Sequence, residues 1–500
     1  MKRIIFIFAA LICIAGCSLK EDAASSITNP YDFYNTPAQV RAALNACYNP
    51  LTSIYGYNYL ICLEGQTDLA SCNGSAQKDA KLDIQPSTTG NSCGPSVWQN
   101  GYVGIRYCLS TRAGIDRSTK MTAEQKAPLR AETTILLCTY YYILTSHFGN
   151  VPFYEDYIET DDDLDRIAHI GRCNADGIRS TLIEELREAC PVLEQVRTSD
   201  IPGNYAGAAM GWMVMARMAA WNKDWDAVIE AGEHLESIYG DLNQYSYADV
   251  QYRNKNTPES IFEIQHTYTP GGLTKTTSCA CCCMPYPRTA GTDIYDGVQI
   301  GELGSQATTY ASLRPTNYMK NTIQREGSTD IRRDYNMCYQ YNGVRFNGNR
   351  TWMGPKFWCP GQYTTYDSGN FKMFRYAGAV LLLAEAHAEK GNFDAAVRYL
   401  NMVRSRANLA DYNGERSVLK LREAVRSECA RELFGEFVRK YDLVRWGIWY
   451  SAVIQNNTYN ILLDNIKPCH EYYPIPLDQV MASGYTLDNA EYEKYGLGGN

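Results

Sequence analysis

The sequence predicts a mainly α-helical protein, in which a scaffold of tetratricopeptide-like helical hairpins is interrupted by long, loop-rich insertions with short strands. Three observations support this fold class. Apolar residues recur every three or four positions over several long segments, as on one face of a helix. Two distant segments repeat one helical-hairpin pattern. The regions between them are rich in Gly, Pro, Thr, Asn and Tyr, which favours loops over long helices.

The helices follow from the apolar spacing. Apolar side chains fall on one helical face over residues 31–54, 97–115, 123–147 and 176–197, and helix continues through 415–447. In contrast, the run around 260–265 reads as a short strand.

The repeated pattern lies in Ala216–Ile229 and Ala384–Val397, which match without a gap. Each copy reads as a helix of small residues, a short polar turn, an aromatic residue followed by Asp-Ala, and a second amphipathic helix. Small residues let two antiparallel helices approach closely, and the aromatic residue (Trp225 or Phe393) fills the wedge at the turn. This pattern is typical of a tetratricopeptide hairpin. Because the copies are far apart, we expect a folded-back scaffold and not a uniform tandem array.

The amino terminus predicts a lipoprotein signal. A basic start precedes an apolar run over residues 4–14, which is too short to span about 30 Å of hydrocarbon. The motif Ile14-Ala15-Gly16-Cys17 is similar to a bacterial lipobox, in which the cysteine becomes the lipidated first residue. We therefore expect residues 1–16 to be a signal peptide and 17–30 a tether anchored through Cys17, with an ordinary signal peptide as the alternative. No later window is apolar enough to cross a membrane.

The rest of the chain, residues 31–500, is expected to form one domain. Long loops held by a rigid scaffold often carry function, so the loop-rich parts are predicted to face the ligand. The predicted division is a helical scaffold over 31–54, 97–240 and 371–450, and loop-rich ligand-side regions over 55–96 and 250–370.

Composition and motifs argue against several classes of function. Lys and Arg number 47 against 55 Asp and Glu, a net charge of −8 that disfavours nucleic acid. No H-E-x-x-H, P-loop or G-x-G-x-x-G motif occurs, and no cofactor is predicted. Residues 90–94 spell G-x-S-x-G without the strand and helix that a nucleophile elbow needs. The acidic run 155–165 lacks the glycine and glutamate of an EF-hand and is expected to be a solvated loop. A glycosidase carboxylate pair has no fixed spacing, so that alternative stays open.

Cysteine is unusually frequent, with 18 in the chain, and four lie in Cys279–Cys283. A zinc or iron–sulfur site would want a second pair of cysteines or a histidine at suitable spacing. The nearest histidine is His266, and Cys338 and Cys359 lie far along the chain. We predict structural disulfides or buried thiols and no metal site, with the pairing left open.

Several segments together resemble the nutrient-binding outer-membrane lipoproteins of the SusD/RagB family. Phe374–Ala386 is similar to the family's R-x-A-E-x-L-L-x-x-A-E-A helix, and Arg431–Gly447 to its E-L-x-F-E-G-x-R-x-x-D-L-x-R-W-G segment. Leu129–Pro152 resembles its L-R-A-x-x-Y-x-x-L-x-x-x-F-G-x-V-P segment, and Tyr473–Pro476 its P-I-P ending. With the lipobox, the resemblance spans nearly the whole chain.

The charged residues of these motifs are expected to have structural roles. We predict that Arg431, Glu432, Asp442 and Arg445 form ion pairs within and between helices, and that Trp446 lies in the core.

The resemblance implies a lipid-anchored outer-membrane protein, facing the cell surface, that captures an oligosaccharide and delivers it to a SusC-like TonB-dependent transporter without cutting it. A peptide ligand is the alternative, because the family includes members of peptide-uptake systems; a protein-interaction scaffold and a glycoside hydrolase are the rival classes. Sugar rings stack on aromatic side chains while polar groups bind their hydroxyls. Trp98 is the first candidate because it follows a polar loop at the start of a helix. The predicted ligand-binding residues are Trp98, Asn100, Tyr286, Arg288, Tyr295, Trp352 and Trp358.

Overall fold

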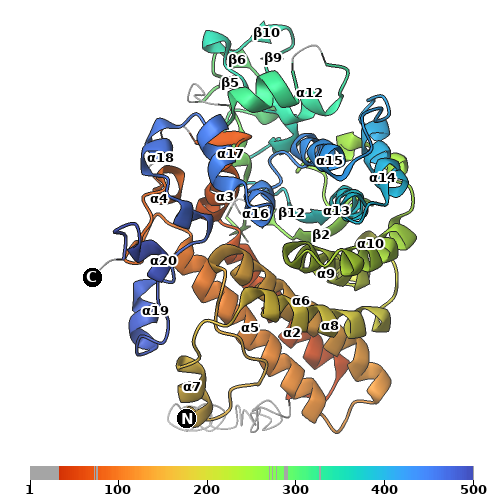
Figure 1. Cartoon of the computed structure of the whole chain (residues 1–500), viewed down its shortest axis with the longest axis vertical. Helices are drawn as coiled ribbons and strands as arrows, with labels where there is room; N and C mark the ends of the chain where they lie inside the picture. Colours follow the sequence, from red (N-terminus) through yellow and green to blue (C-terminus); the bar gives the residue numbers. More distant parts are fainter. Residues whose placement is uncertain are drawn as a thin grey trace, which may run out of the picture.

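A computed structural model describes residues 33–72, 74, 77–269, 271–272, 274–276, 279–285, 291–325 and 328–498. The predicted signal peptide, the tether and Cys17 lie outside these residues. The described chain is mainly helical with few short strands, which confirms the predicted fold class (Figure 1).

A bundle of long helices forms the first part of the scaffold. The predicted helices are present as α2 (Pro37–Ile54), α5 (Gly94–Arg117), α6 (Ala123–Phe148) and α8 (Ala175–Ala189). Helix α5 packs between α2 and α6, and α6 packs against α8. Nearly every side chain in the last five turns of α6 is buried, so this helix runs through the interior and needs no polar face.

Two helical hairpins form the second part, at the positions of the sequence repeat. They are α9 (Ala208–Asn222) with α10 (Trp225–Tyr239), and α13 (Tyr376–Glu389) with α14 (Phe393–Arg406). Helix α10 packs on α13, so the two copies lie side by side (Figure 1). A Cβ at Gly232 of α10 would lie 2.5 Å from Leu383 Cδ2, which shows how closely the hairpins approach.

A two-stranded antiparallel sheet connects the hairpins: β2 (Ser260–Ile264) pairs with β12 (Phe371–Arg375). The chain between them forms the loop-rich region, which has its own small apolar core. One strand of this region, β7 (Leu313–Pro315), pairs with β1 (Ala70–Cys72). Its other elements are β3 (Thr267–Tyr268), β4 (Thr274–Lys275), α11 (Cys279–Cys283), β5 (Ile294–Tyr295), β6 (Val298–Gln299), α12 (Arg332–Asn336), β8 (Met337–Cys338), β9 (Gln340–Tyr341), β10 (Val344–Arg345) and β11 (Trp352–Met353).

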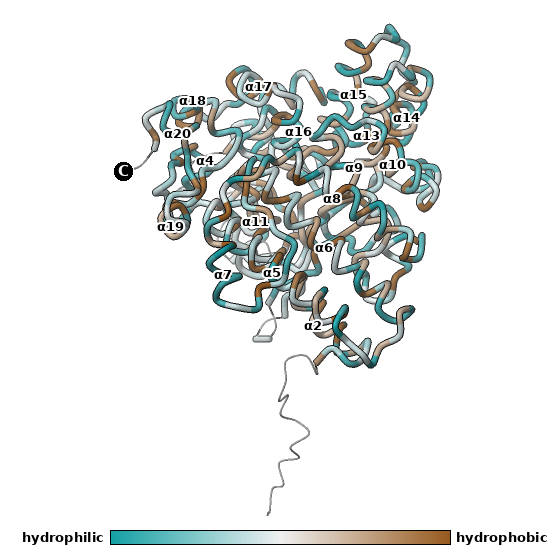
Figure 2. The backbone as a smooth tube through the Cα atoms, turned by 60° about the horizontal axis from the view of Figure 1, so that its bottom comes forward, coloured by the Kyte–Doolittle hydropathy of each residue, from teal (hydrophilic) through white to brown (hydrophobic). Residues whose placement is uncertain are grey.

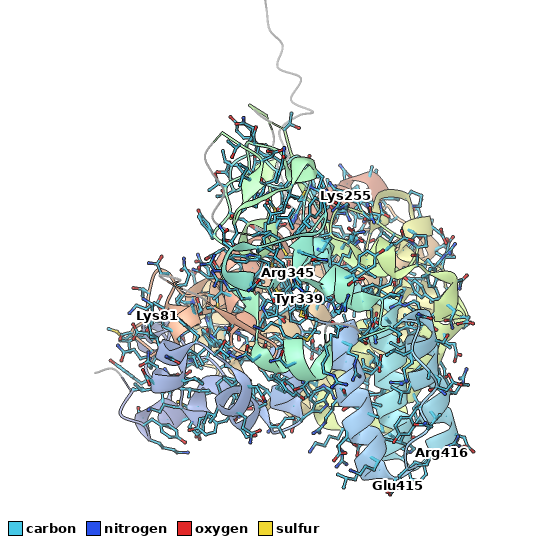
Figure 3. All side chains as sticks on the ribbon, turned by 90° about the horizontal axis from the view of Figure 1, so that it is seen from above. Lys81, Lys255, Tyr339, Arg345, Glu415 and Arg416 are labelled. Atoms are coloured by element: carbon cyan, nitrogen blue, oxygen red, sulfur yellow. The ribbon has the colours of Figure 1, made fainter. Side chains whose placement is uncertain are left out.

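The predicted helix over 415–447 is two helices, α15 (Val418–Glu432) and α16 (Arg439–Arg445). It breaks because Gly435 and Phe437 have φ angles of +67° and +60°, in the left-handed region that ends a helix. Seen from above in Figure 3, Glu415 and Arg416 mark the outer end of α15, and Tyr339 and Arg345 lie toward the middle of the view, in the loop-rich region.

The remaining helices are short. The acidic run is solvated as predicted, but from residue 161 it is the exposed helix α7 (Asp161–Ala168) and not a loop, because Thr160 and Asp163 form a capping box. In Figure 2 the tube beside the α7 label is largely hydrophilic. The others are α3 (Tyr57–Gly65), α4 (Lys78–Lys81), α17 (Trp449–Asn456), α18 (Asn460–Asn465), α19 (Leu477–Ala482) and α20 (Ala490–Glu493). Within the described ranges, no helix has the length and apolarity to cross a bilayer.

The charged residues of the family-like motifs form ion pairs, as predicted, and Glu432, Asp442 and Arg445 are buried. Glu432 has no exposed surface and accepts from Arg332 at 2.9 Å and Arg375 at 2.7 Å. Asp442 pairs with Arg445 at 2.8 Å. Arg431 pairs with Glu428 at 3.4 Å.

Trp446 is less buried than predicted. It is half-buried, and its indole N–H donates to Glu385 Oε1 at 2.6 Å. Three guanidinium groups surround its ring, those of Arg426, Arg439 and Arg445. The side chain therefore packs against the apolar core from its edge and covers part of the ion-pair network.

The cysteines in the described ranges are unpaired thiols, and all of them except Cys173 are buried. The run Cys279–Cys283 forms the short buried helix α11. Of the two predicted states, buried thiols are the one found. Cysteine acts here as a small apolar core residue.

Candidate functional site

A cleft of about 510 Å³ opens beside the amino-terminal half of α5. Trp98, Tyr102 and Arg106 line it at successive intervals of four residues, which place them on one face of the helix. Tyr154, shortly after the end of α6, adds a third aromatic ring. Of the predicted ligand residues that the structure describes, Trp98 is the one that lines this cleft.

Aromatic contacts fix the wall of the cleft. The Trp98 ring lies edge-on to Phe148, with 5.1 Å between centroids, and 5.0 Å from the Tyr102 ring. The Tyr102 and Tyr154 rings are nearly parallel, 6.2 Å apart with 14° between planes. Trp98 is 5% exposed, so the scaffold holds its indole and presents only part of it.

Hydrogen bonds hold the two tyrosines in place. The Tyr102 hydroxyl donates to the Pro152 carbonyl at 2.9 Å, and the Tyr141 hydroxyl donates to the Tyr154 carbonyl at 2.7 Å. Burial, and then the nearby Tyr141 and Tyr154, raise the pKa of Tyr102 well above its usual value. Burial raises the pKa of Tyr154 to about 12. Both side chains are therefore neutral at physiological pH.

The opposite wall comes from the far end of the chain and from the segment around α7. Helix α19 and the residues beside it contribute polar groups, and Ile167 and Ile170 contribute apolar surface. The polar lining residues are Gln99, Arg106, Asp478, Gln479 and Ser483. The cleft thus combines an aromatic wall with a polar rim, which is typical of a small-ligand site.

The cleft is poorly equipped for hydrolysis. Among the described residues that line it, Asp478 is the only carboxylate, whereas the usual glycosidase mechanisms require two. The G-x-S-x-G motif offers no nucleophile either, because Ser92 is buried and its hydroxyl donates to Asp79 at 3.4 Å.

Four of the other predicted ligand residues lie away from the cleft. Trp352, Trp358 and Tyr295 have no exposed surface and form the core of the loop-rich region. In this structure they pack against protein and do not form a ligand surface. The Asn100 amide donates to the Ser96 carbonyl at 2.9 Å, within α5. Tyr286 and Arg288 lie outside the described residues.

Sequence reasoning missed the other residues of the cleft, and four of them show which signals were available. Tyr102 and Arg106 carried a usable signal, since they continue the four-residue spacing from Trp98 along the predicted helix. Asp478 and Gln479 carried none, because only the fold brings α19 to α5.

A second concavity, of about 410 Å³, lies on the other side of Phe148. Its lining includes the guanidinium groups of Arg172 and Arg179 and the rings of Tyr472 and Tyr492. Its lining also includes Phe148, Tyr473 and Tyr495 but no tryptophan, whereas the α5 cleft presents the Trp98 indole.

The sequence and the fold are both similar to known proteins. Residues 332–492 match the model of the SusD family. SusD-like protein P25 of Formosa agariphila is 24% identical, with 97% of each chain covered.

Solved structures share the fold at low sequence identity. A SusD superfamily protein from Bacteroides vulgatus has a TM-score of 0.70 at 18% identity, over 91% of this chain and 98% of that one. Surface glycan-binding protein A from Bacteroides thetaiotaomicron, solved with laminarihexaose, has a TM-score of 0.70 at 20% identity, over 90% and 99% of the two chains.

Proposed function

Since the chain is a SusD-like protein, we propose that it captures a glycan outside the cell and that the α5 cleft is the binding site. One observation carries the choice of site: the rings of Trp98, Tyr102 and Tyr154 form a continuous aromatic wall facing a polar rim.

The chemistry of a sugar suits this arrangement. The C–H face of a pyranose ring is apolar and stacks on an indole or phenol ring, as in other aromatic contacts. The hydroxyl groups at the ring edge need donors and acceptors, which Arg106, Asp478 and Gln479 offer from the rim. A volume of about 510 Å³ falls within the usual range for small-ligand pockets.

The first glycan to test is laminarihexaose, because a relative with the same fold was solved with it. Isothermal titration should give saturable binding with this or another oligosaccharide from a glycan panel. Chromatography of the mixture should recover the oligosaccharide intact, because the protein binds and does not cut. Binding to peptides with no glycan bound would favour the peptide-uptake alternative, and shortened sugars would favour a hydrolase.

We further propose that the protein is anchored in the outer membrane through Cys17 and hands its glycan to a SusC-like TonB-dependent transporter. The lipobox-like motif before Cys17 supports an anchor of this kind.

Two experiments test the anchor and the partner. Cys17→Ala should abolish fatty-acid labelling and release the chain from the membrane fraction, whereas persistent labelling would contradict the anchor. A SusC-like TonB-dependent transporter should co-purify with the wild-type chain from detergent-solubilised membranes of the native organism, and its absence from such preparations would contradict the partnership.

A further inference from the structure

A cluster of two cysteines and a histidine is buried where three helices meet. Cys62 lies in α3, Cys93 directly precedes α5, and His147 lies in the last turn of α6. The two sulfur atoms and a ring nitrogen all lie within 4.8 Å of one another, and the Cys93 Sγ to His147 Nε2 distance is 3.7 Å. No other group of this composition occurs among the residues that the structure describes.

The surroundings aim the histidine at the sulfur atoms. The other ring nitrogen of His147, Nδ1, is 2.9 Å from the hydroxyl of Tyr441, which lies 2.9 Å from the Tyr59 hydroxyl. The imidazole also stacks on Tyr473, with 4.2 Å between centroids. Metal-binding histidines are held in this way, with one nitrogen hydrogen-bonded to a neighbour and the other facing the ion.

The electrostatic environment favours the ligand forms of Cys62 and His147, whereas burial, the hydrogen bond with Cys62 and the charge of Asp79 raise the pKa of Cys93 well above its usual value. The Lys440 ammonium lies 3.7 Å from Cys62 Sγ, and Cys93 sits at the positive end of the α5 dipole. A nearby cation and a helix amino terminus both stabilise a thiolate. Burial, with a smaller contribution from Lys440, lowers the pKa of His147 well below its usual value, so its imidazole is neutral.

We propose that Cys62 Sγ, Cys93 Sγ and His147 Nε2 bind a zinc ion, whose fourth position is left for a water molecule beside the Asp79 carboxylate. Asp79 Oδ1 lies 3.2 Å from Cys93 Sγ. Zinc takes four nitrogen, sulfur and oxygen ligands in a tetrahedron at about 2.0–2.3 Å, so ligand atoms a few ångströms apart need only a small inward movement. The two thiols release their protons to solvent as the ion binds.

The charges of such a site balance. Two thiolates and one carboxylate carry three negative charges, and Zn²⁺ with the Lys440 ammonium carries three positive charges. The buried site is therefore neutral overall, which a low-dielectric interior requires. The ion would join α3, α5 and α6 directly beneath the aromatic cleft, because Phe148, which contacts Trp98, follows His147.

The test uses the intact chain, purified without reductant or chelator and titrated with Zn²⁺ or Co²⁺ alone. We expect about one ion per chain in elemental analysis, thiolate-to-cobalt charge-transfer absorption with Co²⁺, and a Tm that rises with zinc. A chain that retains no ion, or a Cys62–Cys93 disulfide in the mass spectrum of the non-reduced protein, would overturn the proposal. This titration needs no variant to fold.

Variants then identify the ligands. Cys93→Ser and His147→Ala should reduce the bound ion at least tenfold, and Asp79→Asn should weaken binding while leaving the cobalt–thiolate absorption. Cys108→Ser is the matched control, because Cys108 and Cys47 form a second buried, hydrogen-bonded cysteine pair away from the cluster. Loss of the ion in Cys108→Ser but not in Cys93→Ser would contradict the assignment.

Discussion

Arg445 forms a bidentate ion pair with Glu385: its guanidinium group donates from Nη1 at 2.8 Å and from Nη2 at 2.6 Å. The two side chains are buried and belong to α16 and α13, so this pair ties the last part of the scaffold to the second hairpin. The Trp446 indole donates to the same carboxylate. Glu385 therefore accepts three hydrogen bonds from α16 and the residue after it.

Glu385→Gln should destabilise the protein by about 3–5 kcal/mol, because the positive charge of Arg445 stays buried after it has lost the negative charge of this carboxylate. Urea unfolding monitored by circular dichroism measures the change. The matched control is Glu423→Gln, whose pair with Lys420 is about half exposed, so this substitution should leave the stability nearly unchanged. Equal effects of the two substitutions would contradict a structural role for the buried network.

Leu382→Ala should cost about 2–5 kcal/mol, because the side chain is buried in α13 and its removal leaves a cavity between the hairpins. Thermal and urea unfolding measure the loss. Leu419→Ala, on α15, is the control: that leucine is 57% exposed, and little change is expected. An unchanged Tm for Leu382→Ala would mean that α13 is not part of the stabilising core.

Deprotonation of Glu64 should lower the free energy of unfolding as the pH rises through neutrality. Burial raises the pKa of this carboxyl to about 8, although its Oε1 accepts from the Gly435 N–H at 3.2 Å. A carboxyl group whose pKa is higher in the folded state stabilises the protein fully at pH values below its pKa in the unfolded chain, which is about 4.3. This contribution is lost as the pH rises through the pKa of the folded state.

Comparing the wild type with Glu64→Gln isolates this group. Gln keeps the acceptor for Gly435 but does not titrate, so the variant should lose less stability than the wild type between pH 5 and pH 8. Urea unfolding at several pH values measures both slopes. Parallel slopes would show that Glu64 is not the titrating group.

The helical scaffold was predictable because its signals are local. The apolar spacing in residues 123–147 predicted α6 to within a residue, and the matched segments at 216–229 and 384–397 predicted both hairpins. The break at Gly435 and Phe437 was missed, because a left-handed Phe has no clear sequence signature.

The candidate site was predictable only in part. Trp98 could be chosen from its place at a helix start, but Trp352 and Trp358 could not be told from ligand-binding residues, because aromatic residues in loops serve packing as readily as binding. The cysteine–histidine cluster was not predicted, because Cys62, Cys93 and His147 are widely separated in sequence and only the fold brings them together. The sequence pattern favoured the adjacent cysteines of Cys279–Cys283 instead.

The measurement that tests the account most directly is isothermal titration of Trp98→Ala with the oligosaccharide that the wild type binds, beginning with laminarihexaose. Loss of the stacked indole should cost about 1–2 kcal/mol, which weakens binding about tenfold. Because Trp98 is largely buried, the Tm should also fall, so the titration is made well below it with folding verified by circular dichroism. Tyr107→Ala, an exposed aromatic residue of α5 outside the cleft, should bind like the wild type. A folded Trp98→Ala with wild-type affinity would contradict the assignment of the glycan site to this cleft.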